Sequence, residues 1–223
     1  MAAAENYNAW LLERSKPFLG RRALDVGAGI GTFTERLAPL CELVVAVEAD
    51  AEFARILERR FADDSNVRVI DADAGAFKEA PLPGGPFDSI ICFNVLEHIQ
   101  EDDEALASFR GQLAPGGALL LLVPAHPNLY GATDRMLGHE RRYRKGELHG
   151  RLEQAGFSVE VLRHVNPIGA LGWLVSARLL RRREIPRASL ALFDRAVPLV
   201  RHLDRLRLPF GLSLWAVAIN REA

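Results

Sequence analysis

A glycine loop, Gly27-Ala28-Gly29-Ile30-Gly31, carries the clearest chemical signal in the sequence. Leu24 and Val26 before it fit a short buried strand, and Thr32–Leu40 after it has the apolar spacing of a helix. A strand that turns into a helix through glycines places bare backbone N–H groups and a helix N-terminus beside a cleft. Glycine is needed there because a side chain would block a ligand that approaches the backbone. The loop therefore predicts a ligand site.

The glycine spacing narrows the choice of ligand. A dinucleotide fingerprint, G-x-G-x-x-G, needs a glycine at position 32, where this chain has Thr32. Asp25, two residues before the first glycine, is unusual on a buried strand. The string from Asp25 to Gly31 resembles the first motif of class I S-adenosylmethionine (SAM) methyltransferases. That resemblance implies that Gly27 and Gly29 pass the methionine end of SAM and that Asp25 helps to hold it; a generic α/β turn is the alternative.

Acidic residues also end the next two expected strands. The run Leu43–Val47 stops at Glu48-Ala49, and a carboxylate in this place can accept hydrogen bonds from both ribose hydroxyls. The run Val67–Ile70 stops at Asp71-Ala72-Asp73-Ala74. By resemblance to the family, Asp73 accepts from the adenine amino group and the Ala74 backbone meets a ring nitrogen, with Asp71 as the rival to Asp73. A surface acid at a strand end is the alternative for Glu48.

A fourth apolar run, Phe87–Phe93, is followed by Asn94-Val95-Leu96-Glu97-His98. In the resembled family the backbone at Asn94 and Val95 lies against the cofactor. His98 is either a base near the transferred methyl group or a structural residue at the strand end. Tyr7 and Trp10, on an expected helix over Glu5–Phe18, are candidates for a lid over the cofactor and acceptor, with core packing as the alternative.

Acid–base and anion-binding side chains gather after the fifth strand, Ala118–Val123. We expect the methyl acceptor here, because arginine matches carboxylate or phosphate oxygens and histidine or tyrosine can move a proton. The candidates for proton transfer are His126, His139 and Tyr143, and those for acceptor binding are Trp10, His98, Tyr130 and Arg142. The alternative is a solvated charged loop that caps the next helix.

The order of elements indicates an α/β fold. Strands alternate with helices, which calls for right-handed crossovers and a parallel sheet with its ligand crevice at the carboxyl ends of the strands. Resemblance to the family implies a doubly wound, seven-stranded, mostly parallel sheet with an antiparallel last strand at Leu212–Ile219. We expect one domain over residues 1–223, with an N-terminal helix or lid at 1–19 and a helical insertion at 166–212.

The insertion contains two amphipathic helical stretches that meet near Arg183–Pro186. Neither is long or apolar enough to span a bilayer. Three functions compete for it: a cap over the acceptor pocket, a dimer surface, or contact with an anionic membrane. A cap is the most economical, and the chain is expected to be a monomer or a homodimer.

Composition and charge exclude several classes. No signal peptide is visible, and Cys41 and Cys92 lack metal-like spacing, so the sequence predicts a cytoplasmic protein without a metal site. The acidic run Glu101–Glu104 fits the first turn of a helix. Residues 1–133 hold 11 Lys/Arg and 20 Asp/Glu, whereas residues 134–223 hold 17 and 9. An acidic half suits a cationic sulfonium and a basic half suits an anionic partner, while nucleic acid is not indicated.

These patterns favour a SAM-dependent methyltransferase that acts by in-line displacement on a small anionic or amphipathic molecule. The sequence has no Asn/Asp-Pro-Pro-Tyr/Phe motif after the fourth strand and no Pro-Cys pair, which argues against base and protein-glutamine methylation. An NAD(P)-dependent oxidoreductase and a non-catalytic SAM-binding protein are the alternatives.

Overall fold

Seven strands form one sheet with the order β3-β2-β1-β4-β5-β7-β6. The computed structural model describes residues 4–73, 77, 81–174, 194–198 and 208–221. The strands are β1 (Arg22–Val26), β2 (Leu43–Glu48), β3 (Val67–Asp71), β4 (Phe87–Phe93), β5 (Leu113–Pro124), β6 (Ser158–Val165) and β7 (Ser213–Ile219). β7 is antiparallel to both of its neighbours, and the other strand pairs are parallel. The predicted doubly wound sheet with an antiparallel last strand is confirmed.

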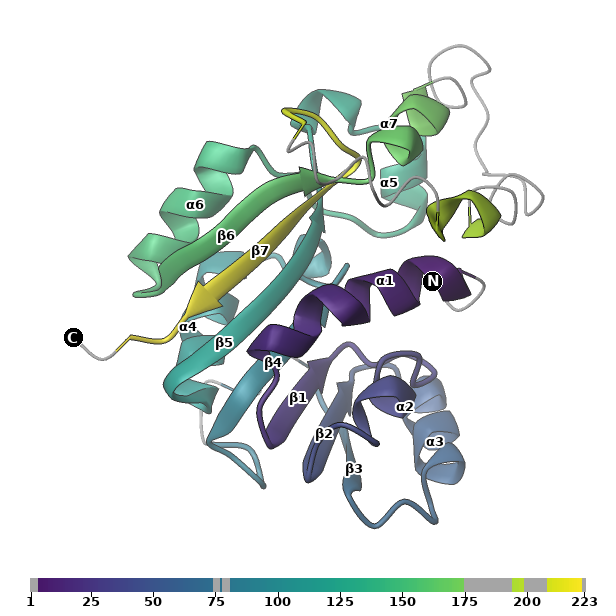
Figure 1. The fold of residues 1–223 in the computed structure, drawn as a ribbon, viewed down its shortest axis with the longest axis vertical. Coiled ribbons are helices and arrows are strands. Elements are labelled where there is room, and N and C mark those ends of the chain that lie inside the picture. The colour runs from purple at the N-terminus through teal and green to yellow at the C-terminus, as the bar shows by residue number, and fades with distance from the viewer. Residues whose placement is uncertain (1–3, 74–76, 78–80, 175–193, 199–207, 222–223) are drawn as a thin grey trace.

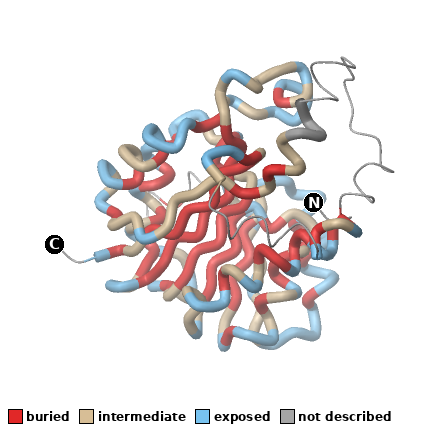
Figure 2. The backbone as a smooth tube through the Cα atoms, turned by 45° about the horizontal axis from the view of Figure 1, so that its top comes forward, coloured by how far each residue is buried: buried red, intermediate tan, exposed pale blue. Residues whose placement is uncertain are grey.

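Helices cover both faces of this sheet (Figure 1). They are α1 (Glu5–Ser15), α2 (Thr34–Leu37), α3 (Ala51–Arg60), α4 (Asp102–Gln112), α5 (Ala132–Met136), α6 (Lys145–Gln154) and α7 (Pro167–Leu174), and residues 194–198 are also helical. Apolar residues of α4 and α6 share a buried cluster with one face of the sheet. Those of α1 and α2 share a cluster with the other face. Figure 2 shows the strands as the buried centre between these layers.

The apolar strands explain why the sheet is covered on both faces. Val44–Val47 in β2 and Leu119–Val123 in β5 are buried throughout. Side chains alternate along each strand, so that Leu24 joins one buried cluster and Ala23 the other. Only a sheet with a layer of helices on each face buries both sets.

The fifth strand begins earlier than the expected Ala118, because α4 ends at Gln112 and β5 already begins at Leu113. The Asn220 side chain donates to the Leu113 carbonyl at 3.0 Å, and the Gly116 N–H donates to the Asn220 carbonyl at 2.7 Å. These bonds from the end of β7 hold the segment in the sheet, which helix propensity alone does not reveal.

The expected insertion is described in part. Helix α7 and residues 194–198 fall within it, whereas residues 175–193 and 199–207 lie outside the described residues. In Figure 1, α5 and α7 lie beyond the ends of β5 and β6, at the carboxyl edge of the parallel strands. Within the described residues, no helix has the length and apolar character required to cross a membrane.

Candidate functional site

The glycine loop joins β1 to α2 and has the left-handed backbone that glycine permits. The φ angles of Gly27, Gly29 and Gly31 are +67°, +58° and +89°. A Cβ on Gly27 would lie 2.4 Å from Val95 Cγ2, and one on Gly31 would lie 2.5 Å from Phe61 Cε2. A Cβ on Gly29 would meet no atom within 4 Å. Two glycines are therefore required by packing, while the third borders open space that a ligand can fill.

Glu48 connects the end of β2 to this loop. Its Oε2 accepts from the Gly29 N–H at 2.7 Å, and its Oε1 accepts from the Asp50 N–H at 3.0 Å. A carboxylate has about four lone-pair positions, so acceptor capacity remains for ligand hydroxyls. The side chain is half-buried, at the edge where β1 and β2 end. Glu48 thus both shapes the loop and presents a carboxylate beside it.

Asp25 links β1 to the helix that follows the loop. Its carboxyl group is buried, and Oδ2 accepts a hydrogen bond from Thr34 Oγ1 at 2.7 Å. Burial raises the pKa of Asp25 to about 7, and the bond from Thr34 opposes that rise. Asp25 therefore supports the glycine turn by linking β1 to α2, which is consistent with an indirect role in cofactor binding.

The other predicted cofactor residues are spread along the same sheet edge. Asn94 has a φ of +55°, and its N–H donates to the Leu122 carbonyl at 2.8 Å. Val95 is the side chain against Gly27, so the turn after β4 contacts the glycine loop directly. Ala49 and Asp73 are exposed beyond β2 and β3. Ala74 lies outside the described residues.

The two aromatic residues of α1 belong to the core. Tyr7 and Trp10 are buried in the cluster on one sheet face, with ring centroids 5.5 Å apart. The helix start is tied to residues 194–198, because Asp194 accepts from the Tyr7 N–H at 3.0 Å and from the Asn6 N–H at 3.2 Å. This placement matches the core-packing alternative for both aromatic residues.

The structure buries part of the basic segment expected to face the acceptor. Arg142 Nε donates to Asp134 Oδ1 at 2.7 Å, and its Nη1 donates to the Ala125 carbonyl at 3.2 Å. The Tyr143 hydroxyl donates to Asp102 Oδ2 at 2.8 Å, and burial raises the pKa of Tyr143. Both side chains therefore fasten the segment to the fold, and we remove them from the proposed acceptor site.

The three predicted histidines lie in two ring pairs, one of which is completed by His164. His98 and His139 meet edge-to-face with centroids 4.8 Å apart, and burial lowers the pKa of His98. His126 stacks on His164 at 5.0 Å near the ends of β5 and β6. Tyr130 is half-buried, and its hydroxyl donates to the His139 carbonyl at 2.8 Å. The structure thus brings Tyr130, His98 and His139 together but not Tyr143.

Glu97 is a buried residue that the motif analysis did not single out. Its side chain is fully buried, and neither carboxylate oxygen has a hydrogen-bond partner among the described residues. Burial raises the pKa of Glu97 to about 8, while its own N–H and Arg142 oppose the rise. In the sequence it stands between apolar Leu96 and polar His98 without any spacing signal.

Comparisons with known proteins agree with this geometry. A model of the methyltransferase domain matches residues 24–121. A Mycobacterium tuberculosis protein named as an uncharacterized methyltransferase is 35% identical over 124 residues, which are 56% of this chain and 60% of the relative. A ubiquinone biosynthesis O-methyltransferase of Caulobacter is 31% identical over 105 residues, 47% of this chain and 41% of that one. This chain thus spans about 60% of the length of the first relatives it matches.

A solved structure shows the same fold over nearly the whole chain. The N-methyltransferase NodS of Bradyrhizobium japonicum, in complex with S-adenosyl-L-homocysteine, has a TM-score of 0.63 at 18% identity and covers 97% of this chain and 86% of its own. The open space at Gly29 and the carboxylate of Glu48 fit such a cofactor. Residues 24–121 thus match a methyltransferase domain, and the seven-stranded sheet around them has a Rossmann-like order with an antiparallel last strand.

Proposed function

We propose that this protein transfers the methyl group of SAM to a small anionic or amphipathic acceptor. The observation that carries the proposal is the glycine loop, where Gly29 borders open space and its N–H is held by the carboxylate of Glu48. Glu48 would bind the ribose hydroxyls, and Asp25 would brace the loop. Bound SAM supplies an activated methyl group for in-line displacement.

The acceptor would lie beyond the ends of β4 and β5. His98 is exposed, and His126 and Tyr130 are half-buried there, so these polar groups can orient an acceptor or take a proton from it. The excess of basic residues over 134–223 supports an anionic acceptor. The name of the Caulobacter relative, which places it in ubiquinone biosynthesis, supports a small-molecule acceptor.

A screen with methyl-labelled SAM tests this proposal. The purified chain is incubated with labelled SAM and fractionated small molecules and lipids, and label is sought in acidic and amphipathic fractions. We expect label in one such fraction, with turnover lost in His126→Ala or Tyr130→Phe at unchanged SAM affinity. Binding of SAM without transfer to any fraction would instead support a non-catalytic SAM-binding protein.

A further inference from the structure

Three potential metal ligands meet beside the turn that follows β4. Glu97 and His98 belong to that turn, and His139 lies in the segment after α5. One ligand atom from each residue lies within 4.8 Å of the others. The two segments are joined by the backbone, since the Glu140 N–H donates to the Glu97 carbonyl at 2.8 Å. This backbone hydrogen bond therefore holds the segment that carries His139 beside the turn that carries Glu97 and His98.

Glu97 points to a missing ligand. A fully buried carboxyl group whose two oxygens lack hydrogen-bond partners among the described residues is costly, because a buried polar group needs a hydrogen-bond partner or a metal ion. The imidazole of His139 lies close by, with its Nε2 3.9 Å from Glu97 Oε1. That distance is too long for a hydrogen bond.

Each histidine uses its Nδ1 for a contact with the protein, which leaves Nε2 as the candidate metal ligand. His139 Nδ1 lies 3.0 Å from Asp134 Oδ1, so a proton on Nδ1 leaves a lone pair on Nε2. His98 Nδ1 lies 3.1 Å from the Gly138 carbonyl, which fixes the same tautomer. A carboxylate or carbonyl behind a histidine is the usual support for a metal-binding imidazole. Arg142 Nε donates to the same oxygen of Asp134 at 2.7 Å.

We propose that Glu97, His98 and His139 bind one divalent cation of the zinc class. Two imidazole nitrogens and one carboxylate are a ligand set for Zn²⁺ and related first-row metals, with a fourth position left for water or an acceptor oxygen. Ligands about 2.1 Å from an ion lie at most about 4.2 Å apart, so the three groups must close slightly around it. His98 is exposed and can make that movement.

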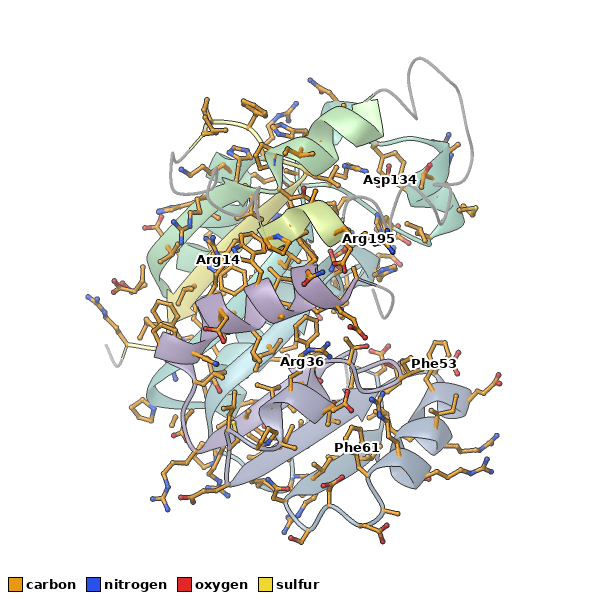
Figure 3. All side chains as sticks on the ribbon, turned by 45° about the vertical axis from the view of Figure 1, so that its right-hand side comes forward. Arg14, Arg36, Phe53, Phe61, Asp134 and Arg195 are labelled. Atoms are coloured by element: carbon orange, nitrogen blue, oxygen red, sulfur yellow. The ribbon has the colours of Figure 1, made fainter. Side chains whose placement is uncertain are left out.

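The site is distinct from the predicted SAM contacts, although both lie at one edge of the sheet. Val95, two residues before Glu97, covers Gly27 of the glycine loop. Figure 3 shows Asp134, the support of His139, on α5 above this edge. The proposal does not depend on methyl transfer, and a negative result for the metal would leave the proposed function standing.

Calorimetric titration of the chelator-stripped full chain with Zn²⁺ tests the proposal. We expect one ion per chain, with affinity reduced at least about tenfold in Glu97→Gln, His98→Ala and His139→Ala. His149→Ala is the matched control, since His149 is a half-buried histidine on α6 paired with Glu153, and it should bind as the parent does. Circular dichroism shows whether each variant is folded. If Glu97→Gln does not fold, the Zn²⁺ affinity of His98→Ala decides whether the proposal holds.

Two results would overturn the site. One is the absence of stoichiometric Zn²⁺ binding, or equal affinity in His98→Ala and the parent, which would leave Glu97 as a buried carboxyl group without a metal ion. The other comes from Co²⁺, whose spectrum should show nitrogen and oxygen ligation. A thiolate charge-transfer band would place the ion at Cys41 or Cys92 instead.

Discussion

Buried ionisable side chains decide how the segment after β5 is held. Asp134 receives hydrogen bonds from Arg142 and His139, and these bonds keep the pKa of Asp134 below its usual value although burial acts in the opposite direction. Asp102 receives the Tyr143 hydroxyl and forms an ion pair with Arg151 at 3.1 Å. Breaking a buried ion pair leaves an uncompensated charge, so the primary role of each of these residues is to stabilise the fold.

The buried Asp25 should make stability depend on pH. Its folded-state pKa is about 7, whereas an aspartate in an unfolded chain titrates near 3.9. Its contribution to stability is therefore fully present below about pH 4 and is lost as the pH rises through about 7. The loss should reach roughly 4 kcal/mol over that interval at most.

Asp25→Asn removes this dependence and keeps an acceptor for Thr34. Urea unfolding at several pH values between 4 and 8, without cofactor, should show a smaller decline for the variant than for the parent. Asp63→Asn, at an exposed position, is the control and should follow the parent. Equal declines in the parent and Asp25→Asn would show that the carboxyl group does not bind its proton as proposed.

At the scale of elements, the glycine loop separates folding from binding. Gly29→Ala adds a methyl group into open space at a φ of +58°, so we expect about 1 kcal/mol of lost stability but at least a tenfold loss of SAM affinity. Gly29→Val should abolish binding. Gly111→Ala on α4, where the new methyl group also meets no atom, is the control. Unchanged SAM affinity in Gly29→Ala would remove the loop from the cofactor site.

Gly27 should behave in the opposite way. Its added methyl group would overlap Val95, so Gly27→Ala should lose about 2–4 kcal/mol through overpacking and backbone strain together. The double variant Gly27→Ala/Val95→Ala removes the overlap and should recover part of that loss in chemical unfolding. If the second substitution recovers nothing, the contact between the glycine loop and the turn after β4 is not the cause.

Helix α1 depends on one carboxylate from residues 194–198. Asp194 accepts from two backbone N–H groups of the first turn and from Asn6 Nδ2 at 3.1 Å. Asp194→Ala should cost about 1–3 kcal/mol of stability and hasten proteolysis within α1. The neighbouring Arg195, labelled in Figure 3, is exposed, so Arg195→Ala is the matched control. Equal proteolysis of the two variants would contradict a capping function.

The elements were easier to predict than the side-chain contacts between them. The apolar run Leu43–Val47 is local, and it predicted β2 to within a residue at each end. Glu97 and His139 are far apart in the sequence, and no motif links them. The burial of Tyr143 follows from its packing against α4. The ends of the predicted strands were therefore enough to locate the site, whereas the side-chain contacts within it could be identified only from the structure.

At the scale of the whole molecule, the sheet collects the predicted cofactor residues at one edge. Asp25, Glu48 and Asn94 lie in or just after β1, β2 and β4, whose carboxyl ends are neighbours in the strand order. Parallel strands bring their carboxyl ends together, which is why residues far apart in sequence can form one crevice. The fold thus explains why the predicted cofactor motifs lie at one edge of the sheet. The chemical class of the acceptor, by contrast, is proposed from the charge distribution and from the names of relatives.

Calorimetric titration with SAM and with NAD tests the central claim most directly. We predict that the chain binds SAM and not NAD, because Thr32 replaces the third glycine of the dinucleotide fingerprint. Glu48→Ala should weaken SAM binding by about 1.5–3 kcal/mol, the range for hydrogen bonds to a charged group, while Glu58→Ala at an exposed position of α3 should not. Binding of NAD in preference to SAM, or equal SAM affinity in the parent and Glu48→Ala, would contradict the account.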